Sequence, residues 1–211
     1  GQVLIPRVLE NSKANMAMNG INDIEAVFEQ PFYQLQKPLR LSRNSNNPGF
    51  VGDSQMTELP VGYIGIKVQS FGLNKWDIQT DHLDWETDDT LGLECSGIVY
   101  KVGAEVHGIT VGDRVACLGA GTARSFYHDR ASAFQRINDE MSLQLASALP
   151  LAYTVAYYVV NHLSMVESKD VVLVHDAGSH FGQALLEVYL LRDARVFATV
   201  NGPDEKDLLS S

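Results

Sequence analysis

The part of the chain best suited to ligand chemistry is LVHDAGSHFGQ, residues 173–183. It overlaps a short apolar run, Val171–Val174, and it contains the glycines Gly178 and Gly182. A strand, a glycine-containing turn and a helix in this order can hold the pyrophosphate of a nucleotide at the helix N-terminus, because the backbone there can approach the phosphates closely. The sequence therefore predicts a strand at Val171–Val174 and a helix that opens at Gly182.

Other reactive arrangements are missing from the sequence. Ser179 directly follows a glycine, so GSHFG is not the G-x-S-x-G turn that exposes a nucleophilic serine. The G-x-x-x-x-G-K-[ST] phosphate loop is also missing. No C-x-x-C pair occurs, and four of the histidines lack the spacing of metal ligands: His82, His107, His128 and His162. We therefore expect no metal site, since zinc sites need several such ligands together.

The composition is that of an ordinary globular protein and argues against two kinds of partner. Hydrophobic residues make up 45% and charged residues 20% of the 211 residues. The net charge of −10 argues against nucleic-acid binding, which needs a basic face. No apolar run is long enough to predict a membrane span. Cys95 and Cys117 are too few for a disulfide scaffold, so a reduced cytoplasmic location is expected.

The residue pattern divides the chain into three parts. Residues 1–27 are polar and irregular, and together with a start that lacks Met they indicate a connector from an upstream domain. Residues 28–148 contain short alternating segments and glycine turns, which predict a β module. Residues 149–211 begin with a helix near Pro150 and continue as strand, helix and strand. This last pattern is the βαβ unit that opens a parallel, doubly wound sheet.

The ordered series of motifs resembles the medium-chain dehydrogenase/reductase superfamily. More narrowly, it is similar to the enoyl-reductase domain of fungal highly reducing polyketide synthases. The pieces that carry the resemblance are, in chain order, GQVLIPR, KPLRL, GLNKWDI, LGLECSGIV, VGDRV, ALPLAYTVAYYVV, VLVHDAGSHFGQALLEV and VFATV. They span essentially the whole chain. The fold that the resemblance implies is α/β plus β, with a GroES-like all-β module followed by the first βαβ part of an incomplete Rossmann-type domain.

The activity that the resemblance implies is NADPH-dependent reduction of an enoyl thioester carried on an acyl-carrier domain. Most of that chemistry would belong to the nicotinamide, while the protein would orient the reactants. Zinc-dependent relatives carry G-H-E where this chain has GLE, with Leu93 in place of the histidine. Glu94 and Cys95 are therefore expected to be structural residues of a buried strand.

The phosphate turn departs from the family pattern. The family reads approximately H-A-A-A-G-G-V-G-Q, whereas residues 175–183 read H-D-A-G-S-H-F-G-Q. Ser179 and His180 replace the two adjacent glycines, and Asp176 adds a carboxylate nearby. We therefore expect a degenerate site that binds no cofactor, with NADP(H) as its ligand if it is still functional. The residues of this site are Gly178, Ser179, His180, Phe181, Gly182, Gln183 and Lys206.

Two further segments match family positions. After the second strand, VNGPDEK places Lys206 where relatives carry a basic residue for the 2′-phosphate, but Asp204 and Glu205 beside it are acidic. On the substrate side, Asn74 and Asp77 match the family's N-F-[KR]-D segment. A plainer interpretation is equally open, in which Asn74 caps a turn and Asp77 starts a short helix.

Two functions follow from the resemblance. The first is a non-catalytic enoyl-reductase-like domain, without catalytic residues, that serves as architecture in a homodimeric megasynthase. Its partners would be the other domains of that synthase and a separate enoyl reductase acting in trans. The alternative is the N-terminal part of an active NADPH-dependent enoyl reductase, whose protonating Lys and Asp would follow Ser211. A stand-alone protein similar to quinone reductases is a weaker third option.

Overall fold

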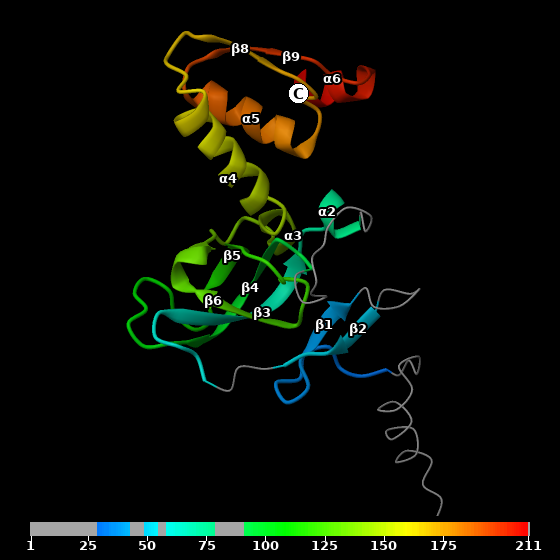
Figure 1. Ribbon diagram of the computed structural model, residues 1–211, viewed down its shortest axis with the longest axis vertical. Coiled ribbons are helices and arrows are strands. Elements are labelled where there is room, and N and C mark those ends of the chain that lie inside the picture. The colour runs from blue at the N-terminus through cyan, green and yellow to red at the C-terminus, as the bar shows by residue number, and fades with distance from the viewer. Residues whose placement is uncertain (1–28, 43–48, 55–57, 79–90, 211) are drawn as a thin grey trace, which may run out of the picture. The chain divides into compact units, whose positions relative to one another are not determined.

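The computed structural model of the chain describes residues 29–42, 49–54, 58–78 and 91–210. The connector predicted for residues 1–27 and His82 lie outside the described residues. The chain divides into two compact units, Gly1–Phe32 and Tyr33–Ser211. Every helix and strand described below belongs to the second unit (Figure 1).

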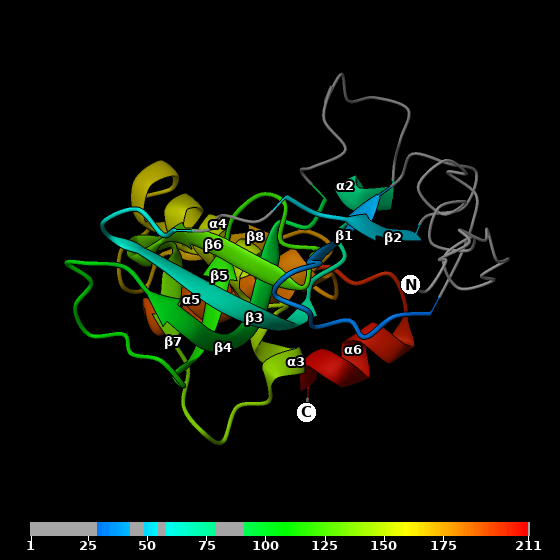
Figure 2. The same cartoon turned by 90° about the horizontal axis from the view of Figure 1, so that it is seen from below.

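The first half of this unit is built on an antiparallel sheet of five strands, in the order β6-β3-β4-β5-β7 (Figure 2). The strands are β3 (Tyr63–Phe71), β4 (Glu94–Val102), β5 (Arg114–Leu118), β6 (Phe126–Arg130) and β7 (Phe134–Arg136), with the 3₁₀ turn η2 (Ala131–Ala133) before β7. A separate hairpin precedes them, formed by β1 (Leu39–Ser42) and β2 (Gly49–Gly52). These strands confirm the predicted all-β module.

The core of the β module follows from the alternation seen in the sequence. Ile64, Ile66 and Val68 on β3 are all at most 2% exposed. They pack with buried residues of the neighbouring strands: Cys95, Val99, Val115, Cys117, Tyr127 and Phe134. A strand with apolar residues at every second position buries one face, as expected for a half-buried sheet.

The second half of the unit contains the predicted βαβ arrangement. Helix α3 (Leu143–Ala146) leads into α4 (Pro150–Tyr158), which Pro150 opens in its first turn, where a missing N–H costs nothing. The chain continues through the π-helical turn η3 (Val159–Leu163), β8 (Val171–Val174), α5 (His180–Leu191), β9 (Arg195–Ala198) and α6 (Pro203–Ser210). Strands β8 and β9 are parallel.

The start of α5 differs from the sequence expectation. The helix begins at His180, two residues before Gly182. Ser179 is its N-cap, and the Ser179 hydroxyl accepts a hydrogen bond from the Gly182 amide at 3.1 Å. Serine is a favoured N-cap residue, because its oxygen satisfies an amide of the first turn. The residue that departs from the glycine pattern therefore sets the helix start.

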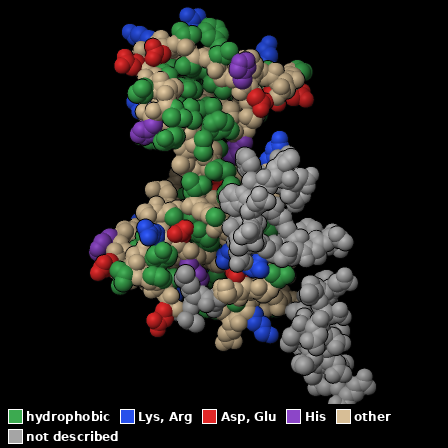
Figure 3. Space-filling model, viewed as in Figure 1, with side chains coloured by type: hydrophobic (Ala, Val, Ile, Leu, Met, Phe, Trp, Pro, Cys, Tyr) green, Lys and Arg blue, Asp and Glu red, His purple; other side chains and the backbone are tan. Residues whose placement is uncertain are grey.

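Among the described residues, the small parallel sheet of β8 and β9 is covered on one face only. Val172 and Val196 pack against the buried cluster that includes Val174 and Val188. On the other face Val171, Leu173 and Phe197 remain 63%, 57% and 51% exposed. Hydrophobic side chains also gather over helices α4 and α5 (Figure 3). No helix in the described ranges has the length and apolar character needed to cross a membrane.

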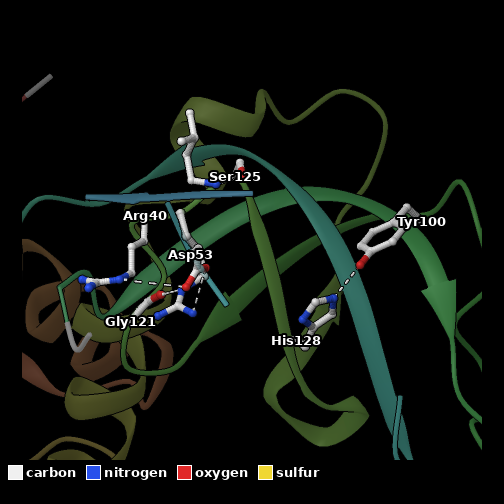
Figure 4. A network of polar contacts seen from close by, with 8 residues as sticks. Arg40, Asp53, Tyr100, Gly121, Ser125 and His128 are labelled. Carbon is white, nitrogen blue, oxygen red and sulfur yellow. Dashed lines mark hydrogen bonds and ion pairs between the residues drawn. The ribbon is translucent and has the colours of Figure 1, made fainter. Parts of the chain in front are cut away.

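Two polar clusters fix the outer parts of the β module (Figure 4). Asp53, which follows β2, lies 3.3 Å from an Arg124 nitrogen and 4.0 Å from the Arg40 Nε atom. The second cluster is a pair: the Tyr100 hydroxyl lies 2.5 Å from His128 Nε2, between β4 and β6. Burial, followed by the nearby charges of Arg124 and Lys101, lowers the pKa of His128 to about 4 from an ordinary 6.5.

The lowered pKa of His128 predicts a pH-dependent stability. The unfolded chain takes up the His128 proton at higher pH than the folded chain does, so the stabilisation is complete above pH 6.5 and is lost as the pH falls toward 4. A shift of this size is worth at most about 3 kcal/mol, and partial exposure reduces it to about 1–2 kcal/mol. We expect His128→Gln to lose this part of the pH dependence.

The measurement is urea unfolding of the parent protein and of the His128→Gln variant, each at about pH 7.5 and about pH 5. Glutamine keeps an acceptor for Tyr100 but does not titrate. The matched control is His107→Gln, at an exposed histidine. If the His128 variant and the parent protein lose the same stability between the two pH values, the interpretation is wrong.

Candidate functional site

The turn between β8 and α5 is held by its own backbone and by Ser179. Asp176 adopts a left-handed conformation, with φ of 54°, which Asp tolerates better than most side chains. The Asp176 carbonyl accepts hydrogen bonds from the Ser179 amide at 3.0 Å and from the Ser179 hydroxyl at 2.7 Å. The Gln183 side chain closes the turn further by donating to the Gly178 carbonyl at 2.8 Å. These bonds fix the strand–turn–helix geometry without a ligand.

Gly182 is required by packing. A Cβ atom added to Gly182 would lie 2.3 Å from the Asp176 carbonyl oxygen and 2.7 Å from the Ala177 Cα atom. Both are backbone atoms, which cannot move aside as a flexible side chain can. The absence of a side chain therefore allows the first turn of α5 to lie directly against the end of β8, one of the known roles of glycine in such turns.

Gly178 is in contact with a residue from another element. A Cβ atom at Gly178 would lie 2.4 Å from both Cδ and Oε2 of Glu205 on α6. The Glu205 carboxylate accepts a hydrogen bond from the Asn201 amide at 2.8 Å. The Asn201 side chain donates in turn to the Asp176 carboxylate at 2.5 Å. Two carboxylates are therefore held at the turn, with Asn201 between them.

Thr199, just beyond β9, completes the connection between the two strand ends. Its hydroxyl lies 3.1 Å from the Asp176 amide and 3.2 Å from His175 Nδ1. The Ala177 amide donates to the Thr199 carbonyl at 2.9 Å. These residues lie at the carboxyl ends of β8 and β9, the edge at which open α/β sheets bind ligands.

The predicted cofactor-site residues lie near this edge, but they make different contacts. His180 and Phe181 are exposed at the start of α5. Lys206 is exposed on α6, next to Glu205. The sequence drew attention to Glu205 only as an acidic neighbour of Lys206, so the residue that packs on the turn was missed. The sequence feature that could have pointed to Glu205 is the acidic pair Asp204 and Glu205, which follows the second strand.

The substrate-side residues form a second cluster. The Asp77 carboxylate accepts hydrogen bonds from the Asn74 and Gly92 amides, both at 2.8 Å. The Asn74 side chain donates to the Glu94 carboxylate at 3.1 Å. Asn74 directly precedes the short helix α2 (Lys75–Ile78), so the helix begins two residues before Asp77. These bonds hold the loop that follows β3 and do not reach residues 175–183.

Glu94 joins this cluster to the second half of the unit. The side chain is buried, with the residue 1% exposed, and its second oxygen accepts a hydrogen bond from the Leu151 amide at 2.9 Å. Leu151 lies in the first turn of α4, where backbone amides lack helical partners and favour a carboxylate. Glu94 is therefore the structural strand residue that the sequence predicts, and it also anchors α4. No group of three or more His, Cys, Asp or Glu within the described ranges could hold a metal ion.

Comparison with known proteins agrees with this architecture. The alcohol dehydrogenase GroES-like domain family matches residues 61–166. A highly reducing polyketide synthase of Talaromyces stipitatus is 31% identical over 216 residues, which cover 99% of this chain and 8% of the synthase. A reducing polyketide synthase of Cochliobolus heterostrophus is 36% identical over 159 residues, covering 75% of this chain and 6% of the synthase. The chain spans less than a tenth of the length of these relatives.

Solved structures extend the similarity to three dimensions. The CurK enoyl reductase superposes with a TM-score of 0.73 at 26% identity, over 82% of this chain and 57% of that protein. The human synaptic vesicle membrane protein VAT-1 homolog-like protein shares the fold, with a TM-score of 0.71 at 24% identity, over 82% of this chain and 59% of that protein. The resemblance to enoyl reductases and to fungal reducing polyketide synthases is confirmed, as is the GroES-like module followed by part of a Rossmann-type domain. The chain belongs to the alcohol dehydrogenase GroES-like family.

Proposed function

We propose that this chain is a non-catalytic enoyl-reductase-like domain with a structural role in a fungal highly reducing polyketide synthase. Residues 28–148 form its GroES-like module, residues 149–211 the first part of its Rossmann-like half, and residues 1–27 a connector. The neighbouring domains of the synthase and its acyl carrier are its partners, in a homodimer. A separate enoyl reductase acts in trans. The observation that carries the proposal is the pair of carboxylates held at the phosphate turn.

NADP(H) does not fit the residues at this turn. A dinucleotide needs backbone amides and close approach to its pyrophosphate, which is strongly negative. Here the Glu205 carboxylate packs on Gly178, and Asp176 contributes a second negative group. The Ser179 hydroxyl is engaged in capping α5. Both the charge and the contacts at the turn therefore oppose a diphosphate.

The remaining candidate residues do not compensate for this charge. Lys206 is solvent-exposed, with acidic residues on either side at Glu205 and Asp207. An exposed lysine in such a setting gives little net attraction for a phosphate, because water and salt screen it. Asn74 and Asp77 use their polar atoms to hold the loop beside Glu94, which favours the structural role over the substrate-side role.

The alternative, part of an active NADPH-dependent enoyl reductase, is favoured by one observation. The strand–turn–helix–strand framework is intact, with Gly182 and Gln183 in the positions that relatives use. Gly182 nevertheless has a packing reason that does not involve a cofactor. The framework therefore supports the family assignment more strongly than it supports catalysis.

The direct test is a titration of the 211-residue chain with NADPH, in which binding is monitored by calorimetry and by NADPH fluorescence. We expect no saturation up to about 1 mM, which corresponds to a binding free energy weaker than about −4 kcal/mol. Circular dichroism and a cooperative thermal transition would establish that the protein is folded. Micromolar affinity, or NADPH-dependent reduction of a crotonyl thioester, would contradict the proposal and support the alternative.

A further inference from the structure

We propose that Glu205 is the residue that closes the phosphate turn: its carboxylate occupies the approach to Gly178 and acts as an internal anion in place of a cofactor phosphate. This inference rests on the proposed function and adds the residue responsible for it. It assigns a role to a side chain from α6, outside the turn that the sequence identified. The consequence is that anion binding at the turn is restored by changing one residue beyond β9.

The contacts of Glu205 support this role. Its Cγ, Cδ and Oε2 atoms all lie within 2.7 Å of the position that a Cβ atom would take at Gly178. In the family pattern position 178 is Ala, and the two phosphate-facing glycines correspond to Ser179 and His180. Glu205 therefore fills the space directly before the positions at which a pyrophosphate would approach the turn. The Asn201 amide holds the carboxylate in place at 2.8 Å.

The neighbouring residues do not have these contacts. His180 and Phe181 are both exposed to solvent, Phe181 to 39%. Asp204 is exposed in the first turn of α6. Ser179 has its hydroxyl committed to Asp176 and Gly182. Glu205 therefore combines three properties: negative charge, contact with the turn and a fixed position.

Asn201 explains how two carboxylates are tolerated near each other. Its backbone amide donates to Glu205 and its side-chain amide donates to Asp176. Hydrogen bonds to ionised acceptors are stronger than neutral ones, so a single residue stabilises both charges. A diphosphate that enters this site would lie near both carboxylates. It would receive no hydrogen bond from Asn201, because the two Asn201 amides already donate to Glu205 and Asp176. Coulomb repulsion at contact distance then opposes binding.

The test compares two substitutions at Glu205 with a matched control. Glu205→Gln keeps the shape and an acceptor for Asn201 but removes the charge, while Glu205→Ala removes both. Asp204→Asn removes one charge from the same helix turn without touching Gly178. Inorganic pyrophosphate and NADPH are titrated separately into each folded variant by calorimetry. We expect pyrophosphate to bind Glu205→Ala at least about tenfold more tightly than the parent chain, with a gain for Glu205→Gln and none for Asp204→Asn.

The outcomes separate this inference from the proposed function. A gain in Glu205→Ala alone identifies the volume of the side chain as the obstacle, and a gain in both variants identifies its charge; either supports the role of Glu205. If both variants bind pyrophosphate as weakly as the parent chain, the role of Glu205 is wrong. The proposed function survives that result, because it fails only if the parent chain itself binds NADPH tightly or reduces the thioester.

Discussion

Replacement of Glu94 by alanine is expected to lower the free energy of unfolding by about 3–5 kcal/mol. The carboxylate is buried, and it accepts hydrogen bonds from the Asn74 side chain and from the Leu151 amide. Alanine leaves both donors without a partner and opens a cavity where the side chain lay against Gly72. Because the donors belong to different halves of the unit, we expect both the loop after β3 and the start of α4 to loosen.

The measurement is urea unfolding, followed by far-ultraviolet circular dichroism, with linear extrapolation to water. Glu94→Gln retains an acceptor oxygen and the side-chain volume, so a smaller loss is expected for it. Glu140→Ala is the matched control, since Glu140 is exposed in the loop after β7. A Glu94→Ala protein that unfolds within about 1 kcal/mol of the control would show that the carboxylate is not needed there.

The second large effect on the free energy of unfolding is expected from the substitution Gly182→Ala. Alanine raises helix propensity by about 1 kcal/mol at most, but its Cβ atom would lie 2.3 Å from the Asp176 carbonyl oxygen. Since the Cβ atom is rigidly attached to the α5 backbone and the atom it meets is also backbone, α5 must shift away from the end of β8, at a cost of about 3 kcal/mol that exceeds the gain. We therefore expect Gly182→Ala to be destabilising by about 2 kcal/mol net.

Gly202→Ala provides the control, because a Cβ atom at Gly202 would meet nothing within 4 Å. Amide hydrogen exchange in α5 and β8 is the most informative readout, since these elements border the contact. We expect faster exchange there in Gly182→Ala and unchanged exchange in β3 and β4. Equal protection in the Gly182 and Gly202 variants would refute the packing role of Gly182.

Much of the fold could be predicted because its elements have strong local signals. The alternation of Ile64, Ile66 and Val68 indicated a half-buried strand, and Pro150 marked the start of α4. The apolar run Val171–Val174 with its following turn indicated the βαβ unit. Helix α5 was placed two residues late, because the expectation followed the glycine and overlooked the capping strength of Ser179. Helix α6 was missed, since its sequence, PDEKDLLS, has few apolar residues to reveal a period.

The candidate site was less predictable, because its important contacts join residues far apart in the chain. The sequence pointed to the turn residues as a group, but the side chain that packs on Gly178 comes from position 205, more than twenty residues away. A sequence pattern does not distinguish an acidic residue that is exposed to solvent from one that packs against a glycine. Glu94 shows the same limit: its burial followed from the strand pattern, whereas its bond to Leu151 depends on how α4 lies against β4.

The half-covered sheet of β8 and β9 has a consequence for the colloidal behaviour of the protein. Val171, Leu173 and Phe197 offer a contiguous apolar surface to water, on a pair of strands whose outer edges are also unpaired within the described chain. Such surfaces attract one another, and salts that are excluded from protein surfaces strengthen the attraction. The net charge of −10 opposes it at low ionic strength, where like-charged molecules repel over longer distances. For the 211-residue chain by itself, ionic strength therefore governs the concentration at which molecules begin to self-associate.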